Sequence, residues 1–281
     1  QTAWDLFSNS EETDIPIMFL GDRSTTVANY VIGIAQERND TIVAISPQLS
    51  DVLSNETDRL EDVLSYRNTL SLSTSHGVMD MNWTYYYDRY NDEYRWIPCN
   101  SDTAGLMAST PEAWDSPAGF NRGQLKNTVK LAWNPSKADR DELYRNNINP
   151  IVRFQGDGVV LFGDKTLQAK PSAFDRINVR RLFNYVNRVT KRTARYVLFD
   201  VNDAITRANF INMMKPTFED IKGKRGLFAY EIICDETNNP PEIIDANKMV
   251  CTIRLQPTRS INFIDINIIA DRTSETLVET L

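Results

Sequence analysis

The chain has 281 residues, of which 41 % are hydrophobic and 25 % are charged, and its formal net charge is −7. These values are typical of globular proteins and argue against a chain that is disordered throughout. No segment approaches the roughly 18 consecutive apolar residues that a membrane-spanning helix needs, and an acidic chain is a poor match for nucleic acid. Neither a membrane nor a nucleic acid is therefore an expected partner.

The first third of the chain predicts an α/β fold. Ile15–Leu20 and Thr41–Ser46 are short apolar runs of strand length, each followed by turn residues. Between them, Thr25–Arg38 has apolar residues at the spacing of a helix that buries one face, namely Val27, Tyr30, Val31 and Ile34. A second helix is predicted over residues 50–66. Strands that alternate with helices in this way favour a mostly parallel sheet with flanking helices.

Regular periodicity fails over residues 68–122, and we expect a long irregular segment there. The segment is rich in aromatic residues: Trp83, Tyr85, Tyr86, Tyr87, Tyr90, Tyr94, Trp96 and Trp114. Such side chains can stack on nucleobases, but Asp88, Asp92 and Glu93 in the same stretch would repel phosphate. Two interpretations remain, which are packing against the sheet and a contact surface for another subunit, where Tyr and Trp are enriched.

The second half of the chain predicts an α+β fold with a small antiparallel sheet. A short helix at 137–147 ends before Asn149-Pro150, because a residue before proline resists helical geometry. We place a domain boundary here, which gives domains at residues 1–148 and 149–281. The elements expected after it are a strand at 159–162, a helix at 177–195, a strand at 196–199, a helix at 204–221, strands at 227–234 and 249–255, and an apolar run at 261–270.

The two halves of the chain differ in charge. Residues 1–150 carry 22 acidic and 12 basic side chains, a net charge of −10, whereas residues 151–281 carry 16 acidic and 19 basic ones, a net charge of +3. An asymmetry of this kind indicates that the two domains face different partners.

Local patterns typical of ligand or catalytic sites are present but incomplete. The run from Gly158 to Thr166 is similar to a phosphate-binding loop, but Asp164 would lie where phosphate charge belongs, and the residues between the glycines suit a buried strand. His76 has no nucleophile elbow and no metal-ligand spacing beside it. Three aspartates in and beside the run from Gly158 to Thr166 lack the spacing of a calcium-binding loop: Asp157, Asp164 and Asp175. We therefore predict no catalytic residue, no cofactor and no metal site.

The predicted helix at 177–195 has one strongly basic face and no acidic residue. The basic side chains are Arg180, Arg181, Arg188, Lys191, Arg192 and Arg195, and the opposite, apolar face holds Val179, Leu182, Phe183, Val186 and Val189. Exposed helix faces normally mix both signs, because like charges at i, i+4 repel one another. The face is therefore either a solvated surface or a ridge that meets an acidic partner. We expect four of its members to be largely exposed: Arg181, Arg188, Arg192 and Arg195.

Four phrases in a fixed order are more specific than these patterns. They are Asp115-Ser-Pro-Ala-Gly-Phe-Asn-Arg-Gly123, Gly156-Asp-Gly-Val-Val-Leu-Phe-Gly-Asp-Lys-Thr166, Phe174-Asp-Arg-Ile-Asn-Val-Arg-Arg-Leu-Phe183 and Ile233-Cys-Asp-Glu-Thr-Asn-Asn-Pro240. Together they resemble the C-terminal half of contractile phage tail sheath proteins of the T-even type, most strongly from about Asn82 to Asp271.

The resemblance implies a structural protein of the virion, with no enzymatic activity. Such a subunit forms a helical homopolymer around the tail tube and contracts to drive the tube into the host cell. Its partners would be other sheath subunits, the tail tube protein, and the baseplate and tail terminator proteins, with assembly in the host cytoplasm. Two alternatives are the sheath of a related contractile injection system (a secretion machine or a bacteriocin) and an α/β nucleotide-binding enzyme or hydrolase.

The resemblance also implies roles for two parts of this chain. The basic helix would belong to the tube-facing domain and contact the tube. Residues 274–281, with Leu277, Val278 and Leu281, would either be a frayed terminus or form an arm that adds a strand to the sheet edge of a neighbouring subunit. Family members carry substantial sequence upstream of the matching region, so residues before Gln1 are expected, and the chain without them is expected to be a monomer.

Overall fold

The computed structural model describes residues 2–54, 56–70, 73–260 and 262. The helices are α1 (Thr2–Asp5), α2 (Thr25–Arg38), α3 (Leu49–Leu53), α4 (Arg59–Thr69), α5 (Asn100–Ser109), α6 (Lys137–Arg145), the 3₁₀ helix η1 (Ala173–Asp175), α7 (Ile177–Ala194), α8 (Ala204–Gly223) and α9 (Pro241–Asp245). The strands are β1 (Ile17–Phe19), β2 (Ile42–Ile45), β3 (Gly77–Asp80), β4 (Trp83–Asp88), β5 (Glu93–Pro98), β6 (Gln124–Leu125), β7 (Lys130–Leu131), β8 (Ile148–Asn149), β9 (Ile151–Phe154), β10 (Gly158–Leu161), β11 (Leu227–Ile233) and β12 (Thr252–Pro257).

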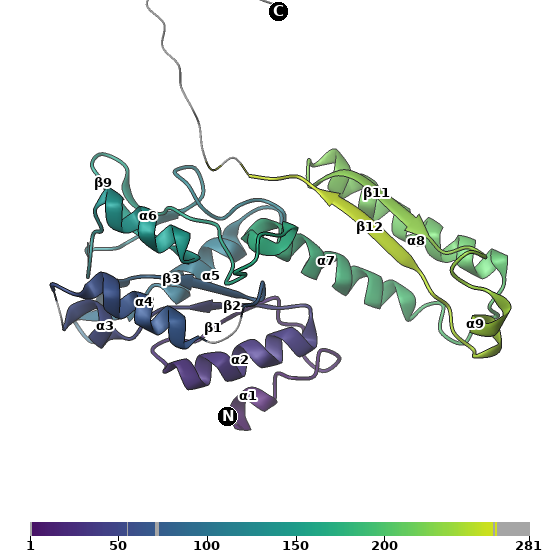
Figure 1. The fold of residues 1–281 in the computed structure, drawn as a ribbon, viewed down its shortest axis with the longest axis horizontal. Helices are drawn as coiled ribbons and strands as arrows, with labels where there is room; N and C mark the ends of the chain where they lie inside the picture. The colour runs from purple at the N-terminus through teal and green to yellow at the C-terminus, as the bar shows by residue number, and fades with distance from the viewer. Residues whose placement is uncertain (1, 55, 71–72, 261, 263–281) are drawn as a thin grey trace, which may run out of the picture.

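The elements form a larger part, which holds α1 to α6 and β1 to β10, and a smaller part, which holds α8, α9, β11 and β12 (Figure 1). Helix α7 leads from the larger part to the far end of the smaller one. Among the described residues, no helix is both long enough and apolar enough to cross a lipid bilayer.

The larger part is built on a parallel sheet with the strand order β1-β2-β3-β8. Parallel neighbours need a crossover connection, which α2 supplies between β1 and β2, and α3 with α4 supplies between β2 and β3. Helix α2 has the predicted bounds, whereas the helix predicted at 50–66 is two helices. The α/β prediction for this part of the chain is confirmed.

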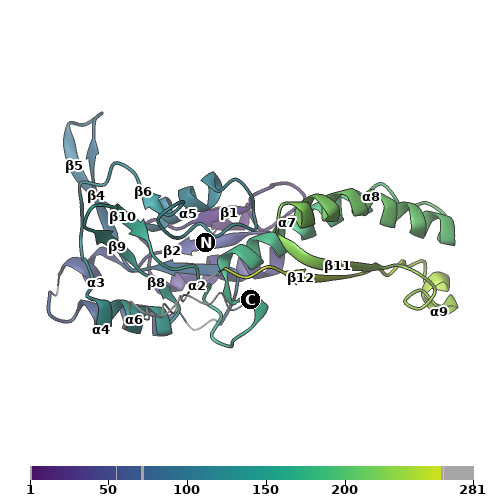
Figure 2. The same cartoon turned by 90° about the horizontal axis from the view of Figure 1, so that it is seen from above.

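Strand β2 is buried on both faces of the sheet. Val43 and Ile45 belong to the same apolar cluster as the buried residues of α2 and α4. Ile42 and Ala44 belong to the cluster that contains Met107 of α5. Figure 2 shows α5 on one side of the sheet and α2 with α4 on the other. The sheet is therefore covered by helices on both faces, which is why β2 is apolar at every position.

The prediction of an irregular segment at 68–122 is wrong. It contains β3, the antiparallel hairpin of β4 and β5, and α5. The hairpin projects from the larger part (Figure 2). Tyr85, Tyr87, Tyr94 and Trp96 contact one another across its two strands. Tyr86 points the other way and donates a hydrogen bond of 2.8 Å to Asp102. Since aromatic residues occupy both faces of β4, the polar–apolar alternation that would reveal a strand is missing.

The predicted boundary at 148/149 falls inside β8, which pairs with β3. The amide of Asn149 donates to the carbonyl oxygens of Met79 (3.1 Å) and Lys165 (2.8 Å). Strands β9 and β10 then form an antiparallel sheet with β6, so residues up to 161 pack with those that precede the predicted boundary. Proline at position 150 ends no domain here, because Asn149 is extended and suits a strand.

The smaller part has an antiparallel pair of strands, β11 and β12, packed on α7 and α8. The buried side chains between them are Leu182, Val186, Phe210, Met214, Phe218, Ile221 and Leu227. Trp114, which precedes the Ser-Pro-Ala-Gly turn, inserts into this cluster and donates from Nε1 to the carbonyl oxygen of Lys224 at 3.2 Å. The α+β prediction for this part is confirmed, and Trp114 joins the two parts.

The strand predicted at 196–199 is wrong. The N–H groups of Tyr196 and Val197 donate to the carbonyl oxygens of Thr193 and Ala194, so the chain turns there instead of extending. Phe199 has φ of 74° and is fully exposed. The apolar run has the length of a buried strand, but Tyr196, Leu198 and Phe199 lie on the surface, and Val197 alone of the run packs against the core of the smaller part. The run predicted at 261–270 lies outside the described residues except for position 262.

Asp80, the last residue of β3, is completely buried. Its carboxyl group accepts hydrogen bonds from the Ser46 hydroxyl (2.9 Å) and from the backbone N–H of Asn82 (3.2 Å). Burial raises the pKa of Asp80 from the ordinary value of 3.8 to about 8. The charged form is disfavoured in the folded chain, so the fold loses stability as the pH rises from about 4 to about 8.

We predict that Asp80→Asn removes this loss of stability. The unfolding free energy of the wild type should fall relative to that of the variant by up to about 1.4 kcal/mol per pH unit within the window. Urea unfolding at pH 5, 6, 7 and 8 measures the difference, and Asp157→Asn, at an exposed turn, is the control with the same chemical change. Parallel pH profiles for the wild type and Asp80→Asn would contradict the assignment.

Candidate functional site

The C-terminal half of the basic face of α7 contacts acidic residues from the start of the chain. Nη1 of Arg188 lies 3.1 Å from Oδ1 of Asp14, and Nη2 of Arg192 lies 3.9 Å from Oδ2. Nη2 of Arg195 lies 3.8 Å from Oε1 of Glu11. Exposed ion pairs contribute about 0–1 kcal/mol each. Part of the basic face is thus paired, weakly, with acidic residues of the same chain. Asp14 and Arg188 are 174 residues apart in the sequence.

The N-terminal half of this face is half-buried. Burial lowers the pKa of Arg180 and of Arg181 to about 10, and the Arg180 guanidinium lies 4.2 Å from the centre of the Phe174 ring. The expected exposure is therefore correct for Arg192 and Arg195, whose side chains are 75 % and 60 % exposed. It is wrong for Arg181, because the first turns of α7 lie against the larger part, and for Arg188, whose side chain is only 25 % exposed beside Asp14.

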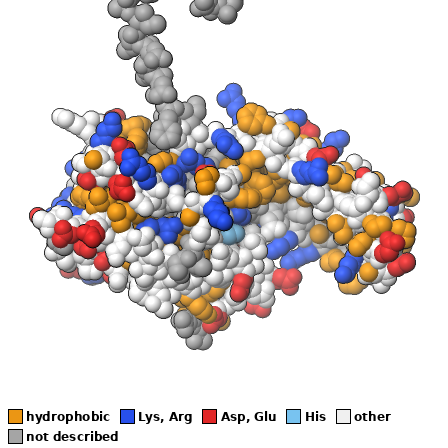
Figure 3. Space-filling view, viewed as in Figure 1, with side chains coloured by type: hydrophobic (Ala, Val, Ile, Leu, Met, Phe, Trp, Pro, Cys, Tyr) orange, Lys and Arg blue, Asp and Glu red, His pale blue; other side chains and the backbone are white. Residues whose placement is uncertain are grey.

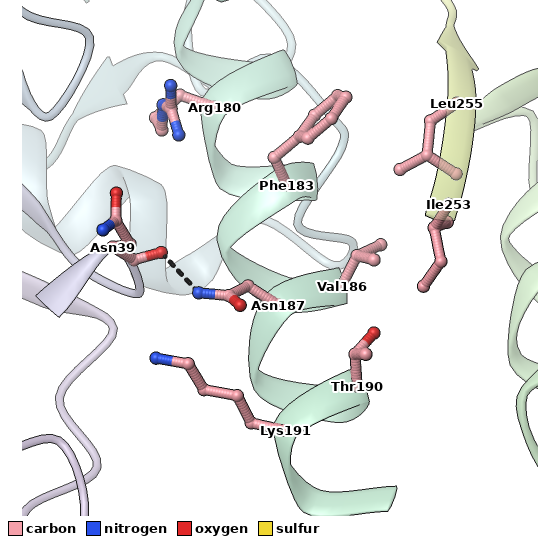
Figure 4. Close-up of a pocket in the computed structure, with 9 residues that line it drawn as sticks. All are labelled: Asn39, Arg180, Phe183, Val186, Asn187, Thr190, Lys191, Ile253 and Leu255. Atoms are coloured by element: carbon pink, nitrogen blue, oxygen red, sulfur yellow. Dashed lines mark hydrogen bonds between the residues drawn. The ribbon is translucent and has the colours of Figure 1, made fainter. Parts of the chain in front are cut away.

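A groove of about 440 Å³ lies along α7, with β12 on one side and Asn39 on the other (Figure 4). On the β12 side, Phe183, Val186 and Thr190 of the helix face Ile253 and Leu255 of the strand, and on the other side Arg180, Asn187 and Lys191 of the helix lie toward Asn39. The Asn187 amide donates to the Asn39 carbonyl oxygen at 2.9 Å, and Nζ of Lys191 donates to the Arg38 carbonyl oxygen at 3.4 Å. The groove is therefore mainly apolar on the β12 side and carries two basic side chains on the Asn39 side.

Strand β12 presents an open edge next to this groove. Within the described part of the chain it pairs with β11 and with no other strand, and Figure 1 shows it between β11 and α7. Its exposed residues Thr252, Arg254 and Gln256 alternate with the half-buried Ile253 and Leu255. An edge strand of this kind can accept a further strand through its free backbone N–H and C=O groups.

The run from Gly158 to Thr166 is a strand between turns, as expected, and its polar groups are occupied within the chain. Gly158 has φ of 83° and opens β10. Nζ of Lys165 donates to the Tyr144 carbonyl oxygen at 2.6 Å, and the Thr166 hydroxyl donates to the Phe174 carbonyl oxygen at 2.8 Å. A phosphate-binding loop instead points its Lys and backbone N–H groups toward the ligand, so this geometry does not favour nucleotide binding.

Gly163→Ala should lower the unfolding free energy by about 1–3 kcal/mol, the usual range for overpacking. A Cβ atom there would lie 2.8 Å from Oδ1 of Asn149 and 3.1 Å from Cδ of Pro150. Oδ1 cannot easily move, because it accepts the Lys165 N–H at 2.7 Å. Gly105→Ala, in α5 with open space around it, is the matched control and should be neutral or stabilising. Thermal unfolding measures both, and an unchanged Gly163→Ala would contradict the crowding.

The local contacts of His76 and of the three aspartates considered as metal ligands do not indicate a catalytic or metal site. His76 is buried, its Nδ1 lies 2.9 Å from the Thr41 carbonyl oxygen, and burial lowers its pKa. Asp164 and Asp175 pair with Arg176 at 3.2 and 3.6 Å, and Asp157 is exposed. Within the described residues, no group of three or more His, Cys, Asp or Glu side chains is arranged to hold a metal ion.

Sequence reasoning missed a polar cluster at the junction of the two parts. We call it the Asp164 junction, and its members are Ser116, Tyr144, Asp164, Arg176, Ser260 and Asn262. Three of the four sequence phrases meet here, since Ser116, Asp164 and Arg176 each come from a different one. Their order along the chain was visible, but their proximity depends on the turn after α5 and on the return of the chain after β12.

Models of sheath domains match two consecutive segments of the chain. The central domain of phage tail sheath proteins matches residues 8–167, and the phage tail sheath C-terminal domain matches residues 169–271. The chain belongs to the phage tail sheath family. The two sheath domains meet between 167 and 169, so the boundary lies nearer to α7 than the predicted 148/149.

Curated relatives come from phages. The tail sheath protein of Enterobacteria phage T4 is 40 % identical, over 96 % of this chain and 44 % of the phage T4 protein. The tail sheath protein of Salmonella phage ViI is 39 % identical, over 96 % of this chain and 43 % of that protein. The chain therefore spans less than half the length of these sheath proteins.

Solved structures of contractile machines share the fold. A chain of the anti-feeding prophage baseplate matches with a TM-score of 0.77 at 16 % identity, over 96 % of this chain and 72 % of that chain. A chain of the PVC sheath complex, an extracellular contractile injection system in the contracted state, matches with a TM-score of 0.73 at 20 % identity, over 86 % and 68 %. The mixed α/β fold is thus the fold of sheath proteins.

Proposed function

We propose that this chain is the part of a contractile tail sheath subunit that packs with other copies around the tail tube. The observation that carries the proposal is the match of both parts of the chain to sheath domains, at about 40 % identity to tail sheath proteins of phages. The subunits pack in helical rings in an extended state and rearrange as near-rigid bodies into a contracted one. That rearrangement drives the tube into the host cell.

The proposed role is mechanical and takes place in the phage tail, after assembly in the host cytoplasm. The partners are other sheath subunits, the tail tube protein, and the baseplate and tail terminator proteins. No residue is assigned a catalytic role and no cofactor is assigned. This agrees with the internal hydrogen bonds of Lys165 and Thr166, which are already used for holding the turn.

The groove and the open edge of β12 support strand exchange between copies. An added strand would bond its backbone to β12 and place alternate side chains against Phe183 and Leu255. In this proposal the strand comes from residues 274–281 of a neighbour, with Leu277, Val278 and Leu281 as its apolar members. These residues lie outside the part of the chain that the structure describes.

The exposed end of the basic face supports a contact with the tube. Arg192 and Arg195 are exposed, and their ion pairs with Asp14 and Glu11 are long, at 3.9 and 3.8 Å. A tube wall that presents carboxylates could take over these arginines without breaking a buried pair. Many weak pairs hold a ring together, and all can be released when the sheath contracts.

Co-expression of the full-length protein with the tube and baseplate proteins tests the proposed function. Electron microscopy should show tubes covered by a regular sheath, and naked tubes beside soluble subunits would contradict it. The sheath of an injection system is the second candidate, favoured by the shared fold at 16–20 % identity. Tube and baseplate genes beside capsid genes would decide for the phage.

A further inference from the structure

Asp164 is a buried carboxylate that receives hydrogen bonds from the residue before α7 and from two residues that follow β12. It is 3 % exposed. Oδ1 accepts from Nη1 of Arg176 at 3.2 Å and from Nδ2 of Asn262 at 2.9 Å, and Oδ2 accepts from the Ser260 hydroxyl at 2.6 Å. Bonds to an ionised acceptor are stronger than neutral ones. The carboxylate therefore holds Ser260 and Asn262 firmly beside the start of α7.

Within a few residues after β12, the chain passes from contacts with the smaller part to contacts with the larger part. Strand β12 ends at Pro257 in the smaller part, where the N–H of Thr258 still donates to the Gly226 carbonyl oxygen at 3.2 Å. Ser260 and Asn262 then bond to Asp164, and Nδ2 of Asn262 also contacts Oη of Tyr144 on α6 at 2.6 Å. The last described residues are thus tied to the larger part.

The rest of the junction is built to keep Asp164 in place. Nη1 of Arg176 also donates to Oη of Tyr144 at 2.6 Å, so the cation bridges the carboxylate and the phenol. Burial, with the charge of Asp164, raises the pKa of Tyr144 to about 12, so the phenol stays neutral. The Ser116 hydroxyl reaches Oδ2 of Asp164 at 3.4 Å from the Ser-Pro-Ala-Gly turn. Four separate segments therefore meet at one carboxylate.

We propose that Asp164 is a positioning residue that fixes the root of the C-terminal segment, which we define as Ser260 and Asn262. Residues 263–281 span at most about 65 Å when fully extended. A root that is not fixed would lower the effective concentration of the arm at a neighbouring β12 edge. This last step rests on the proposed strand exchange, whereas the anchoring is a property of a single chain.

The test uses the full-length protein and two readouts. The double variant Ser260→Ala with Asn262→Ala removes the bonds to the root but keeps the Arg176–Asp164 pair, so the fold should persist. Trypsin cleavage after Arg259, which is exposed, is followed by mass spectrometry, and sheathed tubes are counted by electron microscopy. We expect cleavage to be about tenfold faster and sheathing to fall at least tenfold. Ser116→Ala, on the same carboxylate, should change neither by more than about twofold.

Each outcome separates the anchor from the strand exchange. An unchanged cleavage rate in the double variant overturns the anchor, whatever happens to assembly. Faster cleavage with normal sheathing overturns the positioning role. A chain that ends at residue 273 tests the strand exchange separately. Normal sheathing by that chain would contradict the proposed function of 274–281. The anchor would then be tested by the cleavage rate alone.

Discussion

Leu255→Asp should abolish sheath assembly by the full-length protein while the subunit remains folded. Leu255 is a half-buried wall of the groove between α7 and β12, where an added strand would place an apolar side chain. A short carboxylate at this position cannot extend out of the groove, so strand addition would bury its charge away from water, which is unfavourable. Because the side chain is only half-buried in the monomer, the loss of subunit stability should be about 1 kcal/mol. Counting sheathed tubes and measuring thermal unfolding gives both quantities.

Gln256→Asp is the matched control for this prediction. Gln256 is the next residue of β12 and is exposed on the opposite side of the strand. It receives the same new side chain and the same charge change, but outside the groove, so its variant should assemble. Equal loss of assembly in the two variants would show that any acid on β12 disrupts the lattice. Normal assembly of Leu255→Asp would mean that the groove takes no apolar side chain.

The second large effect is expected from charge reversal on α7. Changing Arg192 and Arg195 to Glu should leave the subunit folded and prevent assembly on the tube, because an acidic tube wall would then repel the sheath. Arg181 and Arg188 are left unchanged, since both are half-buried and their replacement would test folding instead. Each in-chain ion pair that is lost should cost at most about 1 kcal/mol. Raised salt should weaken wild-type sheathing, because exposed pairs are screened over roughly 8–10 Å.

A second variant distinguishes the tube from the N-terminal segment as the true partner of this face. Glu11→Gln with Asp14→Asn removes the in-chain acids and leaves the arginines free. If the face contacts the tube, this variant should keep its sheath to higher salt than the wild type does. Normal sheathing by the Arg→Glu variant, or loss of sheathing by Glu11→Gln with Asp14→Asn, would show that the arginines only hold the N-terminal segment.

The elements with a plain apolar period could be predicted from the sequence. Helix α2 has the predicted bounds, and α7 was expected from Ile177 to Arg195 and ends at Ala194. Both expose a polar face and bury one apolar stripe, so local spacing is enough. The hairpin of β4 and β5 was not predicted, because aromatic residues on both faces of β4 hide the alternation. The apolar composition of residues 196–199 predicts a strand, because composition alone does not distinguish a buried strand from a turn with exposed apolar side chains.

The candidate site was less accessible to sequence reasoning. The basic face of α7 was visible from spacing, but its partners Asp14 and Glu11 lie in the first fifteen residues, and only the fold brings them close. The Asp164 junction brings together five chain segments, so no local pattern indicates it. One signal was available, which is the Asp between Gly163 and Lys165. Asp164 argues against phosphate binding, and in the structure its carboxylate accepts hydrogen bonds from Ser260 and Asn262.

The most direct test of strand exchange in the sheath is an electron cryomicroscopy reconstruction of the full-length protein assembled on its tube. The proposed function predicts density for an added strand along the free edge of β12, connected to a neighbouring subunit and in contact with Phe183 and Leu255. A groove that is empty in the assembled sheath, or one filled by the same subunit's own chain, would contradict the account.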